Sequence, residues 1–264
     1  MWIQCDKKPV GEYLFFAFLI AWVSEFLIVL GDLLGILTGS TGFYLTYAII
    51  GFGAGFAPSY AIYIVLKRHK QISGIKEFFK LYFKTDSFYK TILITLAFYF
   101  AMLIVNVLSN EYLGQPWYNF ILLIPLMIIG GGMEEPGWRG FLQPSLEEKL
   151  PFPVATLLMG VIWAVWHLPL WLIKDASQSS TNFFLFLCFC IFLSFLLVAL
   201  YKLTHSVFAC TLLHAWSNVM SNMFAKSPDL KMILMYLSLT VAAAVICILV
   251  DRKAKAEKSV TKAV

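Results

Sequence analysis

The chain has 264 residues, of which 60% are hydrophobic and only 13% are charged. Soluble domains carry about 25% charged residues, so this composition excludes an ordinary soluble protein and predicts a membrane protein. The formal net charge of +5 fits loops beside an anionic lipid bilayer, and we expect no nucleic-acid partner.

Apolar stretches of about 20 residues, the length that crosses a bilayer, recur along the whole chain. They are continuous and do not alternate with polar residues, which predicts helices and not the strands of a β-barrel. We therefore expect an all-α, polytopic membrane helix bundle of about eight transmembrane helices, with residues 1–264 forming one integral membrane domain. The expected spans lie near Tyr13–Leu37, Phe43–Leu66, Thr91–Leu108, Tyr118–Leu142, Phe152–Ile173, Phe183–Tyr201, Val207–Phe224 and Met232–Val250.

Lysine and arginine are sorted across these spans. With eight crossings, one side receives Lys7, Lys8, the segment 67–90, Lys149, Lys202 and the polar tail 252–264. The other side receives only Lys174, Lys226 and Lys231. By the positive-inside rule, this asymmetry predicts a multi-pass protein of the cell membrane with both termini in the cytoplasm. We expect the cytoplasmic tail 252–264 to be disordered.

The connector from Ile72 to Phe88 alternates apolar residues at helical spacing with lysines. This pattern favours a helix that lies on the cytoplasmic membrane surface, and a lysine-rich loop is the alternative. The cysteines show no metal-like spacing, and we interpret them as small buried apolar residues without disulfides. They are Cys5, Cys188, Cys190, Cys210 and Cys247.

The run M-E-E-P-G-W-R-G-F-L, from Met133 to Leu142, places charges inside an expected span. Glu135 and Arg139 are four residues apart and can form an ion pair on one helix face. Glu134 points about 100° away and has no cationic partner, which suits a general base or acid in a low dielectric. Pro136 and the preceding glycine triplet 130–132 should open the helix here, next to a water-filled cavity.

Two further polar pairs follow on later spans. Trp163 and His167 lie one turn apart, and so do His214 and Asn218. A single buried His or Asn often serves only to form a hydrogen bond between helices. An unpaired Glu, two His and an Asn at similar depth instead favour a functional site. Glu25 on the first span also needs a partner, and Arg139 is one possibility.

These three clusters resemble the CPBP family of membrane peptidases, the CAAX-protease and bacteriocin-processing or Abi proteins. The family pattern is Glu-Glu-x-x-x-Arg, then an aromatic-x-x-x-His, then His-x-x-x-Asn or Asp. The resemblance covers the core region from Tyr118 to Phe224. It implies proteolysis of a membrane-associated peptide or protein.

The resemblance also implies the role of each motif residue. Glu134 and His167 would activate the attacking water, and His214 with Asn218 would stabilise the oxyanion. Glu135 and Arg139 would be a supporting pair, and Trp163 an aromatic wall. No cofactor is certain: zinc held by Glu134, His167 and His214 is possible, and a metal-free glutamate mechanism fits the same residues.

Two other classes of function remain open from the residues. The constellation could serve binding in a non-catalytic membrane scaffold or a bacteriocin self-immunity protein. It could also relay protons in a transporter, although the sequence shows no pair of interrupted spans in corresponding halves. The substrate, whether a prenylated C-terminus, a leader peptide or another membrane protein, is not specified by the sequence.

Overall fold

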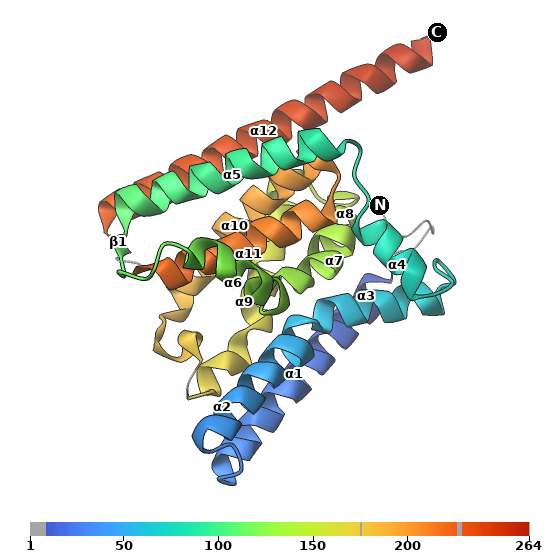
Figure 1. The fold of residues 1–264 in the computed structure, drawn as a ribbon. Coiled ribbons are helices and arrows are strands. Elements are labelled where there is room, and N and C mark those ends of the chain that lie inside the picture. Colours follow the sequence, from blue (N-terminus) through green and yellow to red (C-terminus); the bar gives the residue numbers. More distant parts are fainter. Residues whose placement is uncertain (1–8, 175, 226–228, 264) are drawn as a thin grey trace.

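The computed structural model describes residues 9–174, 176–225 and 229–263, with side chains described up to residue 257. Within these residues the chain is a helix bundle with a single two-stranded ladder, which confirms the all-α fold (Figure 1). Cys5, Lys7, Lys8 and Lys226, which entered the expectations above, lie outside the described residues.

The elements follow one another in chain order. They are α1 (Val10–Leu33), α2 (Gly39–Ala48), η1 (Ile49–Gly55), α3 (Ala57–Arg68), α4 (Ile75–Tyr82), α5 (Phe88–Ser109), β1 (Glu111–Tyr112), α6 (Asn119–Ile129), η2 (Gly132–Glu134), α7 (Glu135–Gly137), η3 (Trp138–Leu142), α8 (Gln143–Glu147), α9 (Phe152–Trp166), η4 (Leu168–Leu172), η5 (Ser177–Ser180), α10 (Phe183–Thr204), α11 (Val207–Met223), β2 (Phe224–Ala225) and α12 (Leu230–Ala263).

Seven helical stretches of the described chain are long and apolar enough to cross a membrane. They are Val10–Leu33, Gly39–Arg68, Phe88–Ser109, Asn119–Glu147, Phe152–Leu172, Phe183–Thr204 and Leu230–Glu257. The eighth expected span, near Val207–Phe224, is the 17-residue helix α11, which is buried along most of its length. It packs against α5, α6 and α10. Because protein and not lipid surrounds α11, it can carry polar residues that a lipid-facing span would not tolerate.

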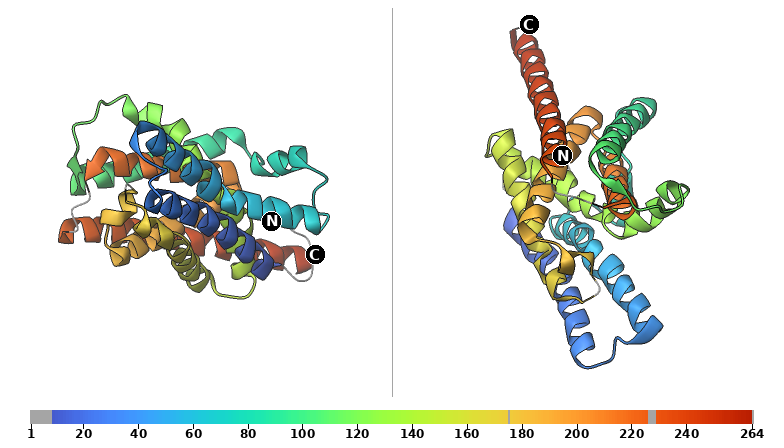
Figure 2. Two further views of the ribbon diagram at one scale, coloured as in Figure 1. Left: turned by 90° about the horizontal axis from the view of Figure 1, so that it is seen from below. Right: turned by 90° about the vertical axis from the view of Figure 1, so that its left-hand side faces the viewer.

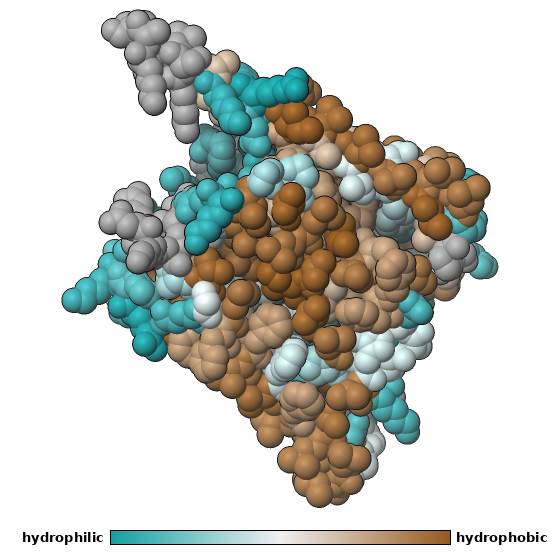
Figure 3. Space-filling view, turned by 180° about the vertical axis from the view of Figure 1, so that it is seen from behind, coloured by the Kyte–Doolittle hydropathy of each residue, from teal (hydrophilic) through white to brown (hydrophobic). Residues whose placement is uncertain are grey.

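The outer surface of the bundle is strongly apolar. Large hydrophobic side chains are exposed along α1, α5 and α12. The space-filling view shows a broad apolar face, with hydrophilic side chains gathered mainly toward the end that carries the C-terminus (Figure 3). A surface of this kind fits contact with lipid chains and not with water.

Polar contacts hold the loops at the two ends of the bundle. At one end, ion pairs join Glu12 to Arg68, Asp86 to His205, and Lys202 to Glu147 and Asp251. At the other end, β1 pairs antiparallel with β2 (Figures 1 and 2). All the ion-paired segments were expected on the cytoplasmic side, and β1 and β2 follow spans expected to end on the other side. The grouping of these segments therefore agrees with eight crossings.

The connector after α3 and the C-terminal tail both form helices. The connector forms a helix, α4, whose Phe78 and Tyr82 pack into the bundle while Ile75, Phe79 and Phe83 stay exposed. The expectation of a disordered tail is wrong, because α12 continues as a helix to Ala263. Lys, Ala and Glu are strong helix formers, and they extend a helix that the apolar span has already nucleated.

The described cysteines form no disulfide with one another. Cys190, Cys210 and Cys247 are buried as expected, whereas Cys188 is exposed on the surface of α10. The absence of disulfides among these four residues matches the expectation from their spacing.

The orientation in the membrane gives a first prediction. Reporter fusions after Lys90 and after Arg252 should both report the cytoplasm, because eight crossings return the chain to the side where it began. A fusion after Lys174 serves as the internal control and should report the opposite side. A cytoplasmic signal at Lys174, or its absence at Arg252, would contradict the eight-crossing topology.

Candidate active site

The first motif lies where the helical path of the chain is interrupted. After α6 ends at Ile129, the chain passes through the short 3₁₀ turn η2, the three-residue α7 and the π-helical turn η3. The backbone N–H of Glu134 donates to the carbonyl of Gly131 at 2.9 Å, which closes the turn. The expected opening of the helix beside Pro136 is therefore confirmed. The interruption is tolerated because α7 packs against α3 and α11 and not against lipid.

Glu134 is buried, with 3% of its surface exposed, and its carboxylate is held by two indole rings. Oε2 accepts hydrogen bonds from Trp163 Nε1 at 2.6 Å and from Trp138 Nε1 at 3.1 Å. None of the ion pairs found among the described residues involves this carboxylate. The two neutral donors fix one oxygen, and Oε1 forms none of the hydrogen bonds found within the described chain. Glu134 is thus oriented without being neutralised.

Glu135 and Arg139 form the ion pair that their spacing predicted. Arg139 Nη1 lies 3.1 Å from Glu135 Oε1, and both side chains are fully buried. Arg139 Nη2 also donates to Ser194 on α10 at 3.1 Å. The guanidinium Cζ lies 5.0 Å from the ring centroid of Trp163, which adds a cation–π contact.

Glu135 has a second partner that links the first motif to the third. His214 Nδ1 lies 2.8 Å from Glu135 Oε1, the same oxygen that Arg139 contacts. Because a carboxylate oxygen can only accept, this nitrogen of His214 carries the proton. Glu135 therefore sets the orientation of His214, and its supporting role includes more than neutralising Arg139.

His167 caps the end of α9. The helix ends at Trp166, and the Pro169 that follows lies in the 3₁₀ turn η4. His167 Nδ1 donates to the carbonyl of Trp163 at 2.8 Å. The imidazole is held edge-on by Trp166, at a centroid distance of 4.6 Å, and by Phe186, at 5.1 Å. The backbone bond leaves Nε2 with its lone pair free.

Asn218 lies one turn after His214 on α11, and both residues face Gly131, the residue immediately before η2. Trp163 borders this space, since its ring lies 5.0 Å edge-on from the ring of His214. The sequence-predicted residues of all three motifs therefore converge from η2, α7, η3, α9 and α11.

The acidic residues of α1 are placed differently from one another. Glu25 is buried, and its Oε2 is among the buried atoms of the described chain that have no hydrogen-bond partner. Arg139, which the sequence offered as one possible partner, is instead bound by Glu135 and Ser194. Glu25 lies within electrostatic range of Glu134. Its carboxyl group is thus part of the electrostatic surroundings of the site.

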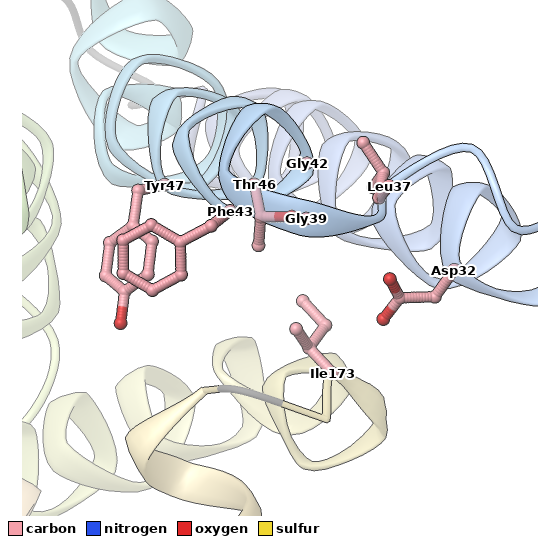
Figure 4. Close-up of a pocket in the computed structure, with 8 residues that line it drawn as sticks. All are labelled: Asp32, Leu37, Gly39, Gly42, Phe43, Thr46, Tyr47 and Ile173. Carbon is pink, nitrogen blue, oxygen red and sulfur yellow. The ribbon is translucent and has the colours of Figure 1, made fainter.

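Asp32 lies away from the motifs. It lines a cavity of about 160 Å³ between the α1–α2 hairpin and Ile173. Figure 4 shows its carboxylate together with Leu37, Gly39, Gly42, Phe43, Thr46 and Tyr47. No motif residue lines this cavity, so it is separate from the candidate active site.

Two contributors to the site were missed by the sequence analysis. Trp138 lies four residues after Glu134, the spacing at which its indole N–H reaches back to the carboxylate. Ser194 is the only hydroxyl residue between Phe183 and Leu200, and this isolation in an apolar helix was a usable signal. A lone serine in a membrane helix is commonly a hydrogen-bonding residue.

The zinc alternative was tested against the donor geometry. Among the described residues, no three His, Cys, Asp or Glu side chains converge as metal ligands do. The arrangement does not fit a three-ligand zinc site, and we derive no chemical step through a metal.

The buried ion pair gives the second prediction. Glu135→Gln or Arg139→Met strands the remaining charge in a low dielectric, so each change should lower stability by roughly 3–5 kcal/mol. The double variant should recover part of this loss, as measured by thermal unfolding in detergent. The exposed Lys253–Glu257 pair has the same spacing and is the control, because its disruption should change stability little. Additive losses in the Glu135–Arg139 double variant would show that the two residues are not coupled.

Comparisons with known proteins agree with the motif assignment. The family model described as "Type II CAAX prenyl endopeptidase Rce1-like" matches residues 115–220, which include every motif residue. CAAX prenyl protease 2 of Methanococcus maripaludis is 29% identical over 150 residues, which cover 53% of this chain and 54% of that protein. The chain thus matches about half the length of this curated relative. The resemblance to the CPBP family of intramembrane peptidases, expected from the three motifs, is confirmed over this core.

Proposed function

We propose that the protein is an intramembrane endopeptidase of the CAAX prenyl protease type, which hydrolyses a peptide bond in a membrane-associated peptide or protein. The observation that carries the proposal is the convergence of Glu134, His167, His214 and Asn218 inside the bundle. Each of these side chains keeps at least one polar atom that forms no hydrogen bond among the described residues. Polar residues that only hold helices together would not leave such groups free, because these groups would form the interhelical hydrogen bonds.

Glu134 and His167 are suited to activate a water molecule. Oε1 of Glu134 and Nε2 of His167 can both accept a proton. Trp163 holds the other carboxylate oxygen of Glu134, Oε2, and the other ring nitrogen of His167, Nδ1. The indole N–H of Trp163 donates to Glu134, and the backbone carbonyl of Trp163 accepts from His167. One residue therefore orients both acceptors, which favours removal of a proton from an attacking water.

His214 and Asn218 are suited to stabilise the negative charge that forms on the carbonyl oxygen. Nδ1 of His214 is held by the Glu135 carboxylate, which leaves Nε2 directed toward Gly131 and available to the oxyanion. The Asn218 amide supplies a second donor. Donors placed before the reaction where charge develops are the largest single contribution in many hydrolases. Glu134 then passes the proton taken from water to the leaving amine.

The substrate class follows from the depth of the site and the comparison. The matched relative is named a CAAX prenyl protease, and the site lies among helices with lipid-facing surfaces. We therefore propose a substrate that is anchored in or at the membrane, with a prenylated C-terminal peptide as the first probe. Comparative peptidomics of cells that express the wild type or Glu134→Gln extends the search to leader peptides and other membrane proteins.

The third prediction concerns the catalytic set. Glu134→Gln, His167→Ala and His214→Ala should each abolish cleavage of a quenched farnesylated peptide, or of the Glu134-dependent products found in cells. Asn218→Ala loses one oxyanion donor and should lower the rate on the order of 10²–10³-fold. All four variants should remain folded and inserted, as judged by detergent size-exclusion profiles. Full cleavage by Glu134→Gln would refute the proposed mechanism.

The fourth prediction concerns metal. Because the donor geometry does not fit zinc, activity should survive exhaustive chelation, and purified protein should hold far less than one equivalent of metal. Elemental analysis beside a chelated activity assay measures both quantities. Stoichiometric zinc, with activity lost on chelation and restored by added zinc, would overturn the metal-free mechanism. Cleavage by neither the wild type nor any variant would favour the scaffold or immunity function.

A further inference from the structure

We propose that α4 binds anionic lipid headgroups at the end of the bundle that carries the C-terminus, and that this contact holds η2 in place. Because η2 ends at Glu134, the effect on catalysis rests on the proposed peptidase function. The contact with lipid does not depend on that function. The proposal adds a lipid partner to the site and makes Tyr82 of α4 a positioning residue.

The outward face of α4 carries an apolar row beside a row of lysines. Residues four apart share one face of a helix, and both rows have this spacing. The apolar row is Ile75, Phe79 and Phe83, which are all exposed. The charged row is Lys76, Lys80 and Lys84, which are also exposed. Helices that combine an apolar face with lysines lie in the interface of anionic bilayers.

The positive charge of this segment is available to an external anion. None of the ion pairs found among the described residues involves the charged row. The acidic residues of segment 70–90 are Glu77 and Asp86. Glu77 accepts from the backbone N–H of Ser73 at 2.6 Å, and Asp86 pairs with His205 at 2.6 Å. Even with Glu77 within electrostatic range of Lys80, the row keeps an excess of positive charge.

The chain on both sides of α4 keeps it near the bilayer surface. Short connections, residues 69–74 and 83–87, join α4 to the membrane-crossing stretches Gly39–Arg68 and Phe88–Ser109. Figures 1 and 2 show α4 at the same end of the bundle as the C-terminus. The partner within reach is therefore the bilayer surface, where anionic lipids complement the charged row.

The inward face of α4 is attached to the bundle by two aromatic side chains. Phe78 and Tyr82 are the buried residues of α4. The Phe78 ring packs edge-on against Tyr63 of α3 at 5.7 Å, and the Tyr82 ring packs edge-on against Phe208 of α11 at 5.6 Å. Helices shorter than about 12 residues are marginal in water on their own, and α4 has eight. The position of α4 therefore also depends on what its outward face meets.

Tyr82 connects α4 to the turn that carries the proposed general base. Its hydroxyl group donates to the Sδ atom of Met133 at 3.6 Å. Met133 directly precedes Glu134 in η2, and its carbonyl accepts from Ser59 Oγ of α3. Thus α3 holds η2 through the backbone, and α4 holds it through a side chain. Lipid that orders α4 keeps Tyr82 against Met133 and so keeps Glu134 in position.

Hydrogen–deuterium exchange of the full-length protein in nanodiscs tests the lipid contact without a substrate. The discs contain phosphatidylcholine alone or an equal mixture with phosphatidylglycerol. Phosphatidylglycerol should slow the exchange of α4 amides at least on the order of tenfold, because three lysines gain contacts with anionic headgroups. The charged-row variant, Lys76→Gln with Lys80→Gln and Lys84→Gln, should exchange equally in the two lipids.

A matched control removes the same charge from another helix at the same end of the bundle. Arg252, Lys253 and Lys255 are exposed on α12, and changing all three to Gln should leave the response of α4 intact. Equal exchange of wild-type α4 in both lipids, or an unchanged response in the charged-row variant, would overturn the lipid contact. Protection by inorganic phosphate in phosphatidylcholine discs would also overturn it, because the lysines would then bind a soluble anion.

Initial rates test the link from α4 to η2. The substrate is a quenched farnesylated peptide without net charge, which reaches both kinds of disc about equally, so a change in kcat reports on the enzyme. If it is not cleaved, a peptide that spans the cleavage site of a Glu134-dependent product replaces it. Phosphatidylglycerol should raise the kcat of the wild type several-fold and leave that of the charged-row variant unchanged.

A double-mutant cycle tests whether Tyr82 carries this link. In phosphatidylglycerol discs Tyr82→Ala should lower kcat several-fold, and adding the charged-row changes should lower it no further. Losses that multiply would show that the lysines do not act through Tyr82. If Tyr82→Ala does not accumulate, Tyr82→Phe, which keeps the ring and loses the hydroxyl donor, takes its place in the cycle.

The two measurements separate this inference from the proposed function. The absence of any Glu134-dependent product from the wild type would refute the peptidase function, and the exchange of α4 would still decide whether it binds lipid. A lipid response of α4 with equal wild-type kcat in both lipids would overturn the hold on η2 and leave the peptidase function intact.

Discussion

The structure depends on how one buried carboxylate, that of Glu135, is shared. Its Oε1 contacts the guanidinium of Arg139 and the imidazole of His214, so a single oxygen joins η3 and α11. Arg139 in turn reaches Ser194 on α10 and lies over the ring of Trp163 on α9. An isolated charge in a low dielectric carries a large desolvation penalty, which only close partners and hydrogen bonds offset. These contacts hold the segments of the site in one arrangement.

The same charged groups allow the proposed reaction to proceed without a change in the net charge of the buried cluster. The charges of Glu135 and Arg139 cancel, which leaves the carboxyl group of Glu134 within electrostatic range of His214. When Glu134 takes a proton from water, its charge moves to the oxyanion beside His214 and Asn218. The net charge of the buried cluster stays constant through this step. A low-dielectric site favours such a step, since no new unpaired charge is created.

The break in the helical path is what allows this cluster to exist. A regular helix from Asn119 to Glu147 would satisfy its own backbone and present an unbroken apolar surface. The η2, α7 and η3 turns instead bring the backbone of Gly131 against α11 and direct two successive glutamates to different partners. Because α3 and α11 surround the break, no irregular backbone is exposed to lipid.

The sequence by itself determined the fold class, the spans and the residues of the three motifs. Hydropathy sets the spans because the bilayer imposes a minimum apolar length, and charged residues in such spans mark a site because their burial is costly. The Glu135–Arg139 pair was also predictable, since helical spacing is local. The extent of α12 was not predicted, because the polarity of residues 252–264 indicated disorder, although lysine, alanine and glutamate favour a helix.

Only the tertiary structure decided which groups meet across helices. It gave Glu135 its second partner in His214, joined Glu134 to Trp138 and Trp163, bound Arg139 to Ser194 and not to Glu25, and placed Gly131 against the donors of α11. These contacts depend on the relative rotation and depth of separate helices, which packing sets and periodicity does not encode. A Cβ atom at Gly131 would collide with Asn218 Nδ2 at 2.6 Å, a contact between residues that lie more than 80 positions apart in the sequence.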